Sequence, residues 1–181
     1  LQTRPGERSA NAVSVPTSSL VGEAGSAGDA VSWLTDLALV MQLAEMVGAM
    51  QWAFDKTLEW AFNRYSFGRP LASYQEIKHR FADMKMWLEA SYAASSAAGR
   101  AVESDSPDRS ELVSAAKFYV GRYGPELMQD CVQLHGGIGV TFDHDLHLFL
   151  RRVTTDVPLF GGPGEHAARL AGIIEAQEGD R

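Results

Sequence analysis

Two arginines, Arg64 and Arg69, are the residues of this sequence best placed to bind an anion. A guanidinium carries a fixed fork of donors that matches the oxygens of a phosphate or a carboxylate. The pair Phe67-Gly68 lies between them, and a glycine lets the backbone bend and lets another group come close. Pro70 follows and prevents a continuous helix. The segment 64–75 therefore predicts an anion-binding corner between two helices.

A second candidate is the glycine-rich run Gly136-Gly-Ile-Gly139, which follows Gln133. A dinucleotide-binding fingerprint needs a preceding strand, and the pattern upstream of Gly136 is helical, so the Rossmann type of site is excluded. Two interpretations of the residues remain open. The run is either a helix C-cap with a sharp turn, or a turn kept small because a ligand passes close to its backbone.

Other reactive residues give weaker patterns. His144 and His147 have the i, i+3 spacing that places two imidazoles on one helix face, but no third ligand cluster accompanies them, so we expect no metal site. Cys131 has apolar neighbours, which favours a buried structural thiol over a nucleophile. No spacing in the sequence supports a Ser-His-Asp or Cys-His site.

Long helices must position these residues, because apolar residues recur with the helical period on both sides of the corner. We expect Ser73 to cap the second helix, and either Asp108 or Ser110 to cap the third. The pattern predicts an all-α protein, an up-down four-helix bundle with extra C-terminal helices. The expected helices cover residues 29–63, 73–103, about 110–134, 144–156 and 164–176.

The first residues have a different composition, rich in Thr, Pro, Gly and Ser. Residues 12–15 suggest a short strand, and a single strand cannot form a sheet alone. We therefore interpret residues 1–22 as the remnant of a β-domain plus a linker, with the other strands and the true N-terminus outside this sequence. Residues 23–176 form the helical domain, and residues 177–181 are expected to be a disordered tail.

The composition is that of an ordinary globular protein, with 45% apolar and 22% charged residues. A net charge of −7 at pH 7 argues against nucleic acid or an anionic membrane surface as the main partner. A single cysteine fits a reducing cytoplasm. Residues 37–54 are very apolar, but Gln42, Glu45 and Gln51 interrupt them, so we expect a buried core helix and not a membrane span.

The pattern Arg-x-x-Phe-Gly-x-Pro, followed by Gln75, resembles the C-terminal helical domain of the acyl-CoA dehydrogenase family. The stretch from Gln133 to Gly139, with Asp145 to Arg152 after it, resembles the second signature of that domain. The resemblance covers roughly residues 10–174. It implies an FAD-dependent enzyme in which this domain holds the ADP half of a flavin bound mainly by a neighbouring subunit. The implied FAD contacts are Arg64, Phe67, Gln75, Gln133, Gly136 and Gly137.

The catalytic base of that family is missing from this sequence. The family removes the α-proton of an acyl thioester with a glutamate, which stands before a glycine in an aromatic-Glu-Gly-Thr turn; here that position is Gly161. Some members carry the glutamate in the first C-terminal helix, where this sequence has Ala38. The resemblance therefore implies no catalytic residue. Glu165, about one helical turn past Gly161, and Glu45 are the remaining candidates for a relocated base.

Certain bacterial acyl-CoA dehydrogenases, including those that act on steroid side chains linked to CoA, are heterotetramers of two different chains. This sequence resembles the chain that lacks the base and helps to hold its partner's flavin. We therefore expect a subunit or fragment that gives FAD contacts to a paired acyl-CoA dehydrogenase subunit, with the acyl-CoA mainly on the partner. Two alternatives stay open: a catalytically competent homo-oligomer with a relocated base, and a flavin-free interaction or scaffold protein.

Overall fold

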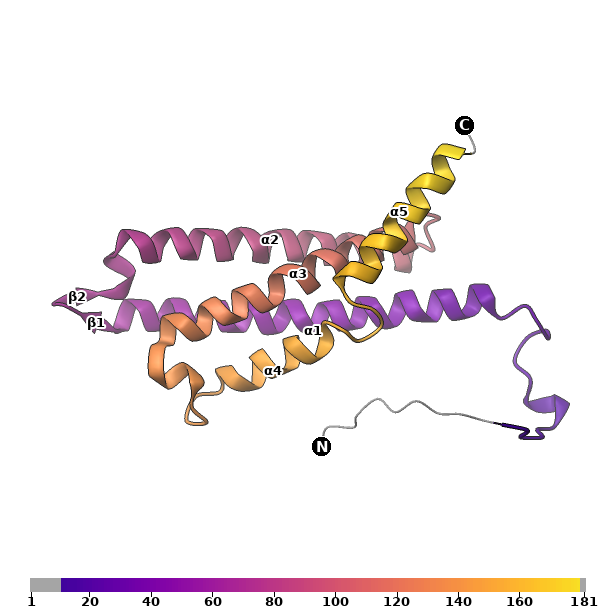
Figure 1. Ribbon diagram of the computed structural model, residues 1–181, viewed down its shortest axis with the longest axis horizontal. Helices are drawn as coiled ribbons and strands as arrows, with labels where there is room; N and C mark the ends of the chain where they lie inside the picture. Colours follow the sequence, from indigo (N-terminus) through magenta and orange to yellow (C-terminus); the bar gives the residue numbers. More distant parts are fainter. Residues whose placement is uncertain (1–10, 180–181) are drawn as a thin grey trace.

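The computed structural model describes residues 11–179, and helices dominate this range (Figure 1). The helices pack as long antiparallel rods joined by short connections. A small two-stranded hairpin forms the corner that follows the first helix. In chain order the elements are η1 (Thr17–Ser19), α1 (Gly28–Asn63), β1 (Tyr65–Ser66), β2 (Arg69–Pro70), η2 (Leu71–Ser73), α2 (Gln75–Glu103), α3 (Arg109–His135), η3 (Gly136–Val140), α4 (Leu146–Asp156) and α5 (Pro163–Gly179).

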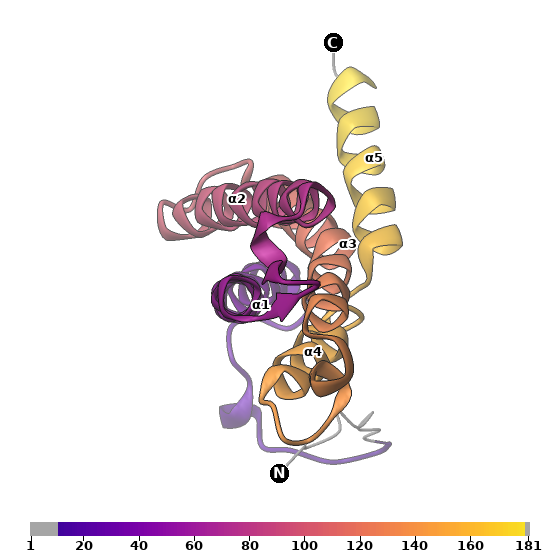
Figure 2. The same ribbon diagram turned by 90° about the vertical axis from the view of Figure 1, so that its left-hand side faces the viewer.

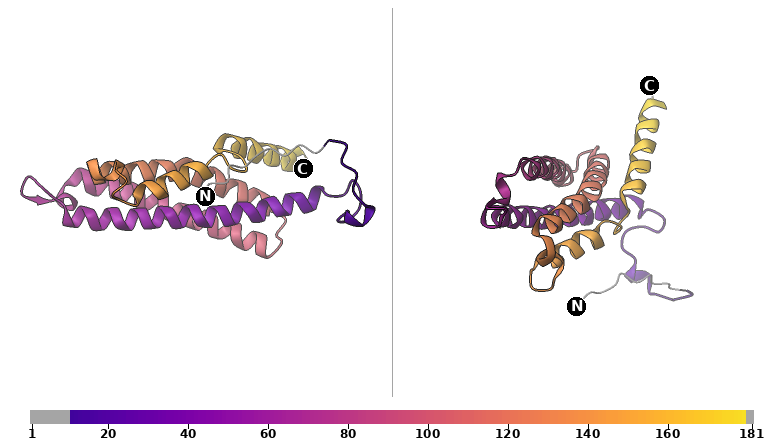
Figure 3. Two further views of the ribbon diagram at one scale, coloured as in Figure 1. Left: turned by 90° about the horizontal axis from the view of Figure 1, so that it is seen from below. Right: turned by 60° about the vertical axis from the view of Figure 1, so that its left-hand side comes forward.

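The core of the bundle lies between α1, α2 and α3, and the shorter α4 packs against α1 and α3 as a fourth member (Figure 2). Large apolar side chains fill this core, and burying one such side chain contributes about 1.5–3 kcal/mol. α5 packs against α3, and near its end Gln177 Nε2 donates to Glu111 Oε2 of α3 at 3.3 Å (Figure 3). The predicted all-α bundle with an extra C-terminal helix is confirmed. Its fully buried side chains include Leu39, Leu43, Met46, Met50, Met84, Leu88, Leu127 and Met128.

The first two helices lie where the apolar period predicts them, but the start of the second was wrong by two residues. Ser73 does not cap α2, because its hydroxyl donates to the Pro70 carbonyl oxygen at 2.7 Å inside η2. Tyr74 holds the N-cap position of α2 without a side-chain cap. The local turn therefore uses the hydroxyl that the sequence assigned to the helix.

The third helix begins as expected after Asp108, but by a different capping arrangement. The Asp108 carboxylate accepts a hydrogen bond from the Ser106 hydroxyl and makes no cap to α3. The Ser110 hydroxyl donates across the bundle to the buried carboxylate of Asp36 on α1. Both expected caps are thus engaged elsewhere.

The last two helices differ from the prediction at their ends. α4 begins at Leu146, because the Leu146 amide donates to His144 Nδ1 at 3.1 Å and the chain turns there. α5 begins at Pro163, a position that suits the fixed φ of proline. It continues to Gly179, so the beginning of the predicted 177–181 tail is helical. Residues 180–181 lie outside the described range.

The predicted strand over residues 12–15 does not form, and the segment is irregular, with Ala12 at φ 55°. A strand needs a neighbour to pair with, and none of the described residues pairs with it. Residues 1–10 of the predicted β-domain remnant lie outside the described residues. The assignment of residues 1–22 to a β-domain stays a prediction.

Among the described residues, α1 is the helix that is long and apolar enough to cross a membrane by length and composition, with a mean hydropathy of 1.3 over an 18-residue window. It packs against α2, α3 and α4 and buries Asp36 and Gln42 among them. Gln42 Nε2 donates to the Asp156 carbonyl oxygen of α4 at 3.1 Å. Only 33% of that window is buried, so the prediction of a core helix holds for the face of α1 whose buried polar side chains bond to neighbouring helices.

Candidate functional site

The corner between α1 and α2 is a tight hairpin, a feature that the sequence did not predict. Arg64 ends α1, and its carbonyl oxygen accepts a hydrogen bond from the Leu71 amide at 2.8 Å, which closes the hairpin. Phe67 and Gly68 form the tip with φ of 49° and 80°. Two consecutive positive φ values are the signature of a type I′ turn. Backbone bonds therefore set the shape of this corner.

The side chains of the hairpin point to solvent. Phe67 is 97% exposed. The guanidinium carbon of Arg69 lies 3.8 Å from the centre of the Tyr74 ring, a cation–π contact that fixes the arginine. The Tyr74 hydroxyl in turn donates to the Ser66 carbonyl oxygen at 2.7 Å. Within residues 11–179 no ion pair involves Arg64 or Arg69, so both cations are available to an anion.

Two contacts bring the ends of three helices together at this end of the bundle. The rings of Trp60 on α1 and His135 on α3 stack with centroids 5.3 Å apart. Arg80 on α2 forms an ion pair with Asp130 on α3, with 2.6 Å between Nη1 and Oδ1. The hairpin, the start of α2 and η3 therefore lie at the same end of the molecule (Figure 1).

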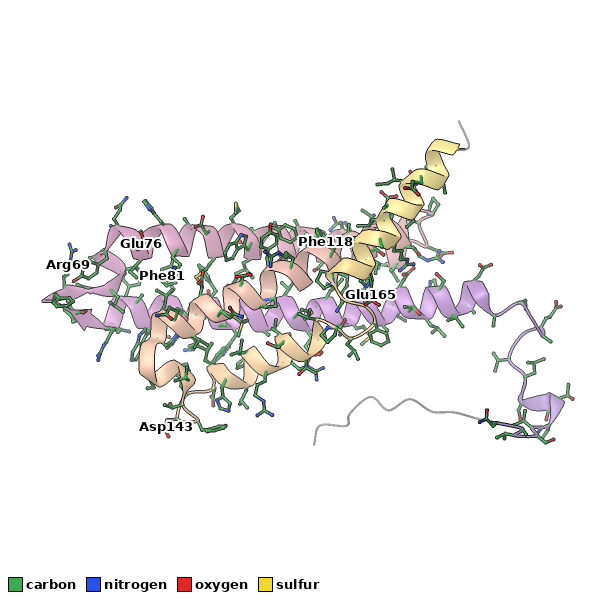
Figure 4. All side chains as sticks on the ribbon, in the orientation of Figure 1. Arg69, Glu76, Phe81, Phe118, Asp143 and Glu165 are labelled. Atoms are coloured by element: carbon green, nitrogen blue, oxygen red, sulfur yellow. The ribbon has the colours of Figure 1, made fainter. Side chains whose placement is uncertain are left out.

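The two glutamines of the predicted site lie on these helix ends, and both are exposed. Gln75 is the first residue of α2, and its amide nitrogen lies 3.0 Å from His79 Nε2. Gln133 lies in the last turn of α3. Figure 4 labels Arg69 and Glu76 at this end. The predicted contacts Arg64, Phe67, Gln75, Gln133, Gly136 and Gly137 are thus all at one end of the bundle.

The three glycines of η3 differ in whether the fold of this chain requires glycine at their positions. Gly136 ends α3 with φ 66°, a left-handed conformation, and its amide bonds to the Gln133 carbonyl oxygen, so it is the C-cap. A Cβ at Gly139 would lie 2.7 Å from the Val132 carbonyl oxygen, so packing requires glycine there. At Gly137 a Cβ would meet no atom within 4 Å, and φ is not positive. The fold of this chain therefore does not require glycine at 137, where the backbone is open to a close approach.

The positions expected for a catalytic base carry no carboxylate. Gly161 lies in the turn between α4 and α5 with φ 103°, and Ala38 is half-buried on α1. Glu165 Oε2 accepts a hydrogen bond from the Gly162 amide at 2.7 Å, which caps the start of α5 (Figure 4). Glu45 is paired with Arg152 on α4 at 2.6 Å. Both alternative carboxylates are thus engaged in structural contacts.

A buried polar network, which the sequence reading missed, holds the end of α4. Lys117 is completely buried, and its Nζ donates to Gln42 Oε1 at 2.7 Å and to the Asp156 carbonyl oxygen at 2.6 Å. Burial lowers the pKa of Lys117 to about 8, and the charge of Asp156 opposes that shift. Burial also raises the pKa of the Asp156 carboxyl, against the charge of Arg152. The apolar period of α3, with Val113 and Val120 buried, was the signal that residue 117 faces the core.

The histidines and the cysteine show no catalytic arrangement. The ring nitrogen Nδ1 of His147 donates to the His144 carbonyl oxygen at 2.8 Å. Over residues 11–179 no three His, Cys, Asp or Glu side chains come together as metal ligands would. Cys131 is buried, as predicted, and burial raises the pKa of its thiol to about 12. A thiol with that pKa is not a nucleophile at neutral pH.

Comparison with known proteins identifies the family. Residues 31–172 match the family model described as acyl-CoA dehydrogenase, C-terminal domain. The chain is 34% identical over 139 residues to acyl-CoA dehydrogenase IpdE2 of Mycolicibacterium smegmatis, and 35% identical over 142 residues to acyl-CoA dehydrogenase FadE34 of Mycobacterium tuberculosis. These matches cover 76% and 78% of this chain but only 42% and 20% of the relatives. The chain therefore spans less than half the length of these relatives.

Solved structures agree with this match. The steroid ACAD Tcur3481-Tcur3483 superimposes with a TM-score of 0.80 and 27% identity, over 84% of this chain and 42% of that chain. Butyryl-CoA dehydrogenase of Megasphaera elsdenii has a TM-score of 0.82 at 23% identity, over 88% of this chain and 42% of that chain, a likeness of fold. The chain therefore belongs to the acyl-CoA dehydrogenase family and has the fold of its C-terminal helical domain.

Proposed function

We propose that this chain is the C-terminal part of an acyl-CoA dehydrogenase subunit that lacks its own catalytic base and completes the flavin site of a paired subunit. The observation that carries the proposal is the contrast between two sites. The base positions hold Gly161 and Ala38. At the end of the bundle that bears Arg64 and Gly137, the arginine forms no ion pair with the described residues and the backbone is open.

The end of the bundle with the hairpin and η3 fits the chemistry of FAD, the cofactor on which members of this family depend. A diphosphate needs cationic donors and a backbone that it can approach closely. Arg64 supplies the donors without a competing carboxylate, and Gly137 supplies the open backbone. The exposed ring of Phe67 offers a flat apolar surface, while the Gln75 and Gln133 amides offer hydrogen bonds. When bound, the flavin accepts the hydride that leaves the β-carbon of the substrate.

The α-proton must leave to a carboxylate, and in this proposal the paired subunit supplies that group. A base has to reach the proton directly or through one water. Glu165 is held at the Gly162 amide and Glu45 at Arg152, so neither is free for this task. The residues of this chain therefore bind and orient the cofactor, and they transfer no proton.

The substrate in this proposal is an acyl-CoA thioester bound mainly by the partner. A steroid side-chain CoA is the class we favour, because a similar structure is a steroid ACAD whose name joins two gene products. That name also supports a hetero-oligomer of two different chains as the assembly.

The test is the flavin-to-protein ratio, measured by absorbance on the full-length protein that contains this chain. We expect little flavin when it is expressed alone and one FAD per pair when the partner acyl-CoA dehydrogenase is co-expressed. Arg64→Ala should lower that occupancy several-fold. Arg122→Ala is the matched control, because Arg122 is an exposed arginine of α3 paired with Glu126.

Three outcomes would contradict the proposal or a part of it. One FAD per chain in the protein expressed alone, with dehydrogenation that Glu165→Gln abolishes, would establish a homo-oligomer with a relocated base. A colourless protein under every co-expression condition would establish a flavin-free interaction protein. Unchanged occupancy and activity in Arg64→Ala would remove Arg64 from the site.

A further inference from the structure

The turn between α4 and α5 has a strained backbone. Phe160 and Gly161 are consecutive residues with φ of 60° and 103°. A non-glycine residue in the left-handed region is uncommon, and a bulky one persists only where its surroundings hold it. Phe160 is 51% exposed, so burial of its own ring does not explain the conformation. Other contacts must hold this turn.

His166 supplies one of these contacts from inside α5. Its side chain is buried, with 3% exposure, and its Nε2 lies 3.1 Å from the Phe160 carbonyl oxygen. Because a carbonyl only accepts, Nε2 carries the proton of the neutral ring and Nδ1 does not. Nδ1 is buried and has no partner among the residues described. Burial lowers the pKa of His166, which favours this neutral form.

Two residues of α3 fix both sides of the turn. Lys117 Nζ bonds to the Asp156 carbonyl oxygen just before the turn. Just after it, Pro163 packs on Gly121, where a Cβ would lie 3.1 Å from Pro163 Cγ. Lys117 and Gly121 are four residues apart and share one face of α3. The start of α5, and with it the His166 ring, is therefore held against the bundle.

The His166 ring occupies the space that a side chain at position 161 would need. A Cβ built on Gly161 would lie 3.1 Å from His166 Nε2 and 3.4 Å from its Cδ2. The ring is buried and hydrogen-bonded to the turn, so the shift of a few tenths of an ångström that a Cβ would require strains that bond. The φ of 103° adds a separate cost for any side chain of an L-amino acid. A side chain at position 161 would therefore have to displace the His166 ring by a few tenths of an ångström and also adopt an unfavourable φ.

We infer that His166 is a positioning residue that holds the Phe160-Gly161 turn in a conformation that disfavours any side chain at position 161, and so disfavours a carboxylate at the base position of this chain. The inference rests on the proposed function only where it identifies position 161 as that of the missing base. The contact and the backbone strain lie within this chain and involve neither a partner subunit nor a flavin. Restoring a glutamate at position 161 therefore requires a change in α5 as well.

A double-mutant cycle on the 181-residue chain tests the contact. Gly161→Ala should lower the unfolding temperature, and Gly164→Ala, the matched control on α5, should not, because a Cβ at Gly164 meets no atom within 4 Å. In a His166→Ala background the cost of Gly161→Ala should shrink, because only the cost of φ remains. An equal cost in both backgrounds would overturn the inference.

A second measurement separates positioning from simple packing. His166→Gln keeps a donor at the ε position, whereas His166→Leu removes it. We expect slow amide hydrogen exchange at Gly161 and Gly162 in the wild type and in the Gln variant, and fast exchange in the Leu variant. Equal protection in the Leu variant would refute the role. The ¹⁵N shifts of the wild-type imidazole give an independent check, because a proton on Nδ1 would also refute it.

The functional arm uses Gly161→Glu in the co-expressed pair. We expect no added turnover per pair from this single substitution. A second active site created by Gly161→Glu alone would overturn the inference. The stability cycle and the exchange measurements need no flavin. A chain that binds no FAD would therefore contradict the proposed function and leave the inference about His166 standing.

Discussion

Replacing the buried Lys117 by methionine should remove a pH dependence of the unfolding free energy that the wild type shows between about pH 8 and pH 10.5. The substitution removes two hydrogen bonds, to Gln42 Oε1 and to the Asp156 carbonyl oxygen. It also removes a charge from a site without exposure to solvent. The cost of burying the charge offsets part of what the two hydrogen bonds contribute, whereas the variant leaves Gln42 Oε1 buried without its donor. Gln42 Nε2 still bonds to the Asp156 carbonyl in the variant.

The magnitude follows from the pKa of Lys117, which burial lowers from its ordinary 10.5 to about 8. Each pKa unit corresponds to about 1.4 kcal/mol, so the folded state disfavours the charged lysine by about 3 kcal/mol. This cost is complete below pH 8. Between pH 8 and 10.5 the unfolded chain binds more protons than the folded chain, so the free energy of unfolding rises with pH. Above pH 10.5 the cost is gone.

Urea denaturation followed by circular dichroism, at pH 7 and pH 10, measures this effect. From pH 7 to pH 10 the wild type should gain about 2 kcal/mol of unfolding free energy relative to Lys117→Met. Lys78→Met, at an exposed lysine of α2, is the control and should follow the wild type. If the wild type and Lys117→Met change equally with pH, the lysine is charged in both states and the reasoning fails.

Three further predictions concern single residues. Gly137→Ala should change the unfolding free energy by less than about 0.5 kcal/mol, because its Cβ meets no atom of this chain. The same Cβ should lower the flavin-to-protein ratio of the paired complex, because it would lie where the cofactor approaches the backbone. Gly139→Ala should destabilise the chain by about 1–3 kcal/mol in the same denaturation assay, because its Cβ would lie 2.7 Å from the Val132 carbonyl oxygen. Cys131, with its buried thiol, should react with a chromogenic disulfide reagent only after denaturant is added, and rapid reaction of the native chain would contradict its burial.

The helical architecture could be predicted from the sequence because it depends on a period that each helix repeats many times. α1 begins within one residue of the prediction and ends at Asn63, and α2 ends at Glu103 as expected. The local bonds were not predictable in this way. The hydroxyl of Ser73 could accept from an amide of α2 or donate to a nearby carbonyl, and in the structure it donates to the Pro70 carbonyl oxygen.

The site could be predicted only in part, because its residues differ in how much local pattern identifies them. The family resemblance grouped Arg64 and Gly137 in one predicted site, and both lie at the same end of the bundle. It could not assign roles to Lys117 or His166, whose environments are made by distant segments. Lys117 meets Gln42 75 residues away along the chain, and only the folded bundle brings the two together.

In the hairpin that follows α1, different groups determine the fold and the proposed flavin contact. Its shape comes from the bond between the Leu71 amide and the Arg64 carbonyl, and from the Tyr74 hydroxyl on the Ser66 carbonyl. The side chains of Arg64 and Phe67 contribute little to that shape. A library of substitutions at these two positions, sorted once for folding and once for flavin retention, should therefore give different sets of survivors. Residues that flavin retention requires but folding does not would then show which side chains at this corner recognise the ligand.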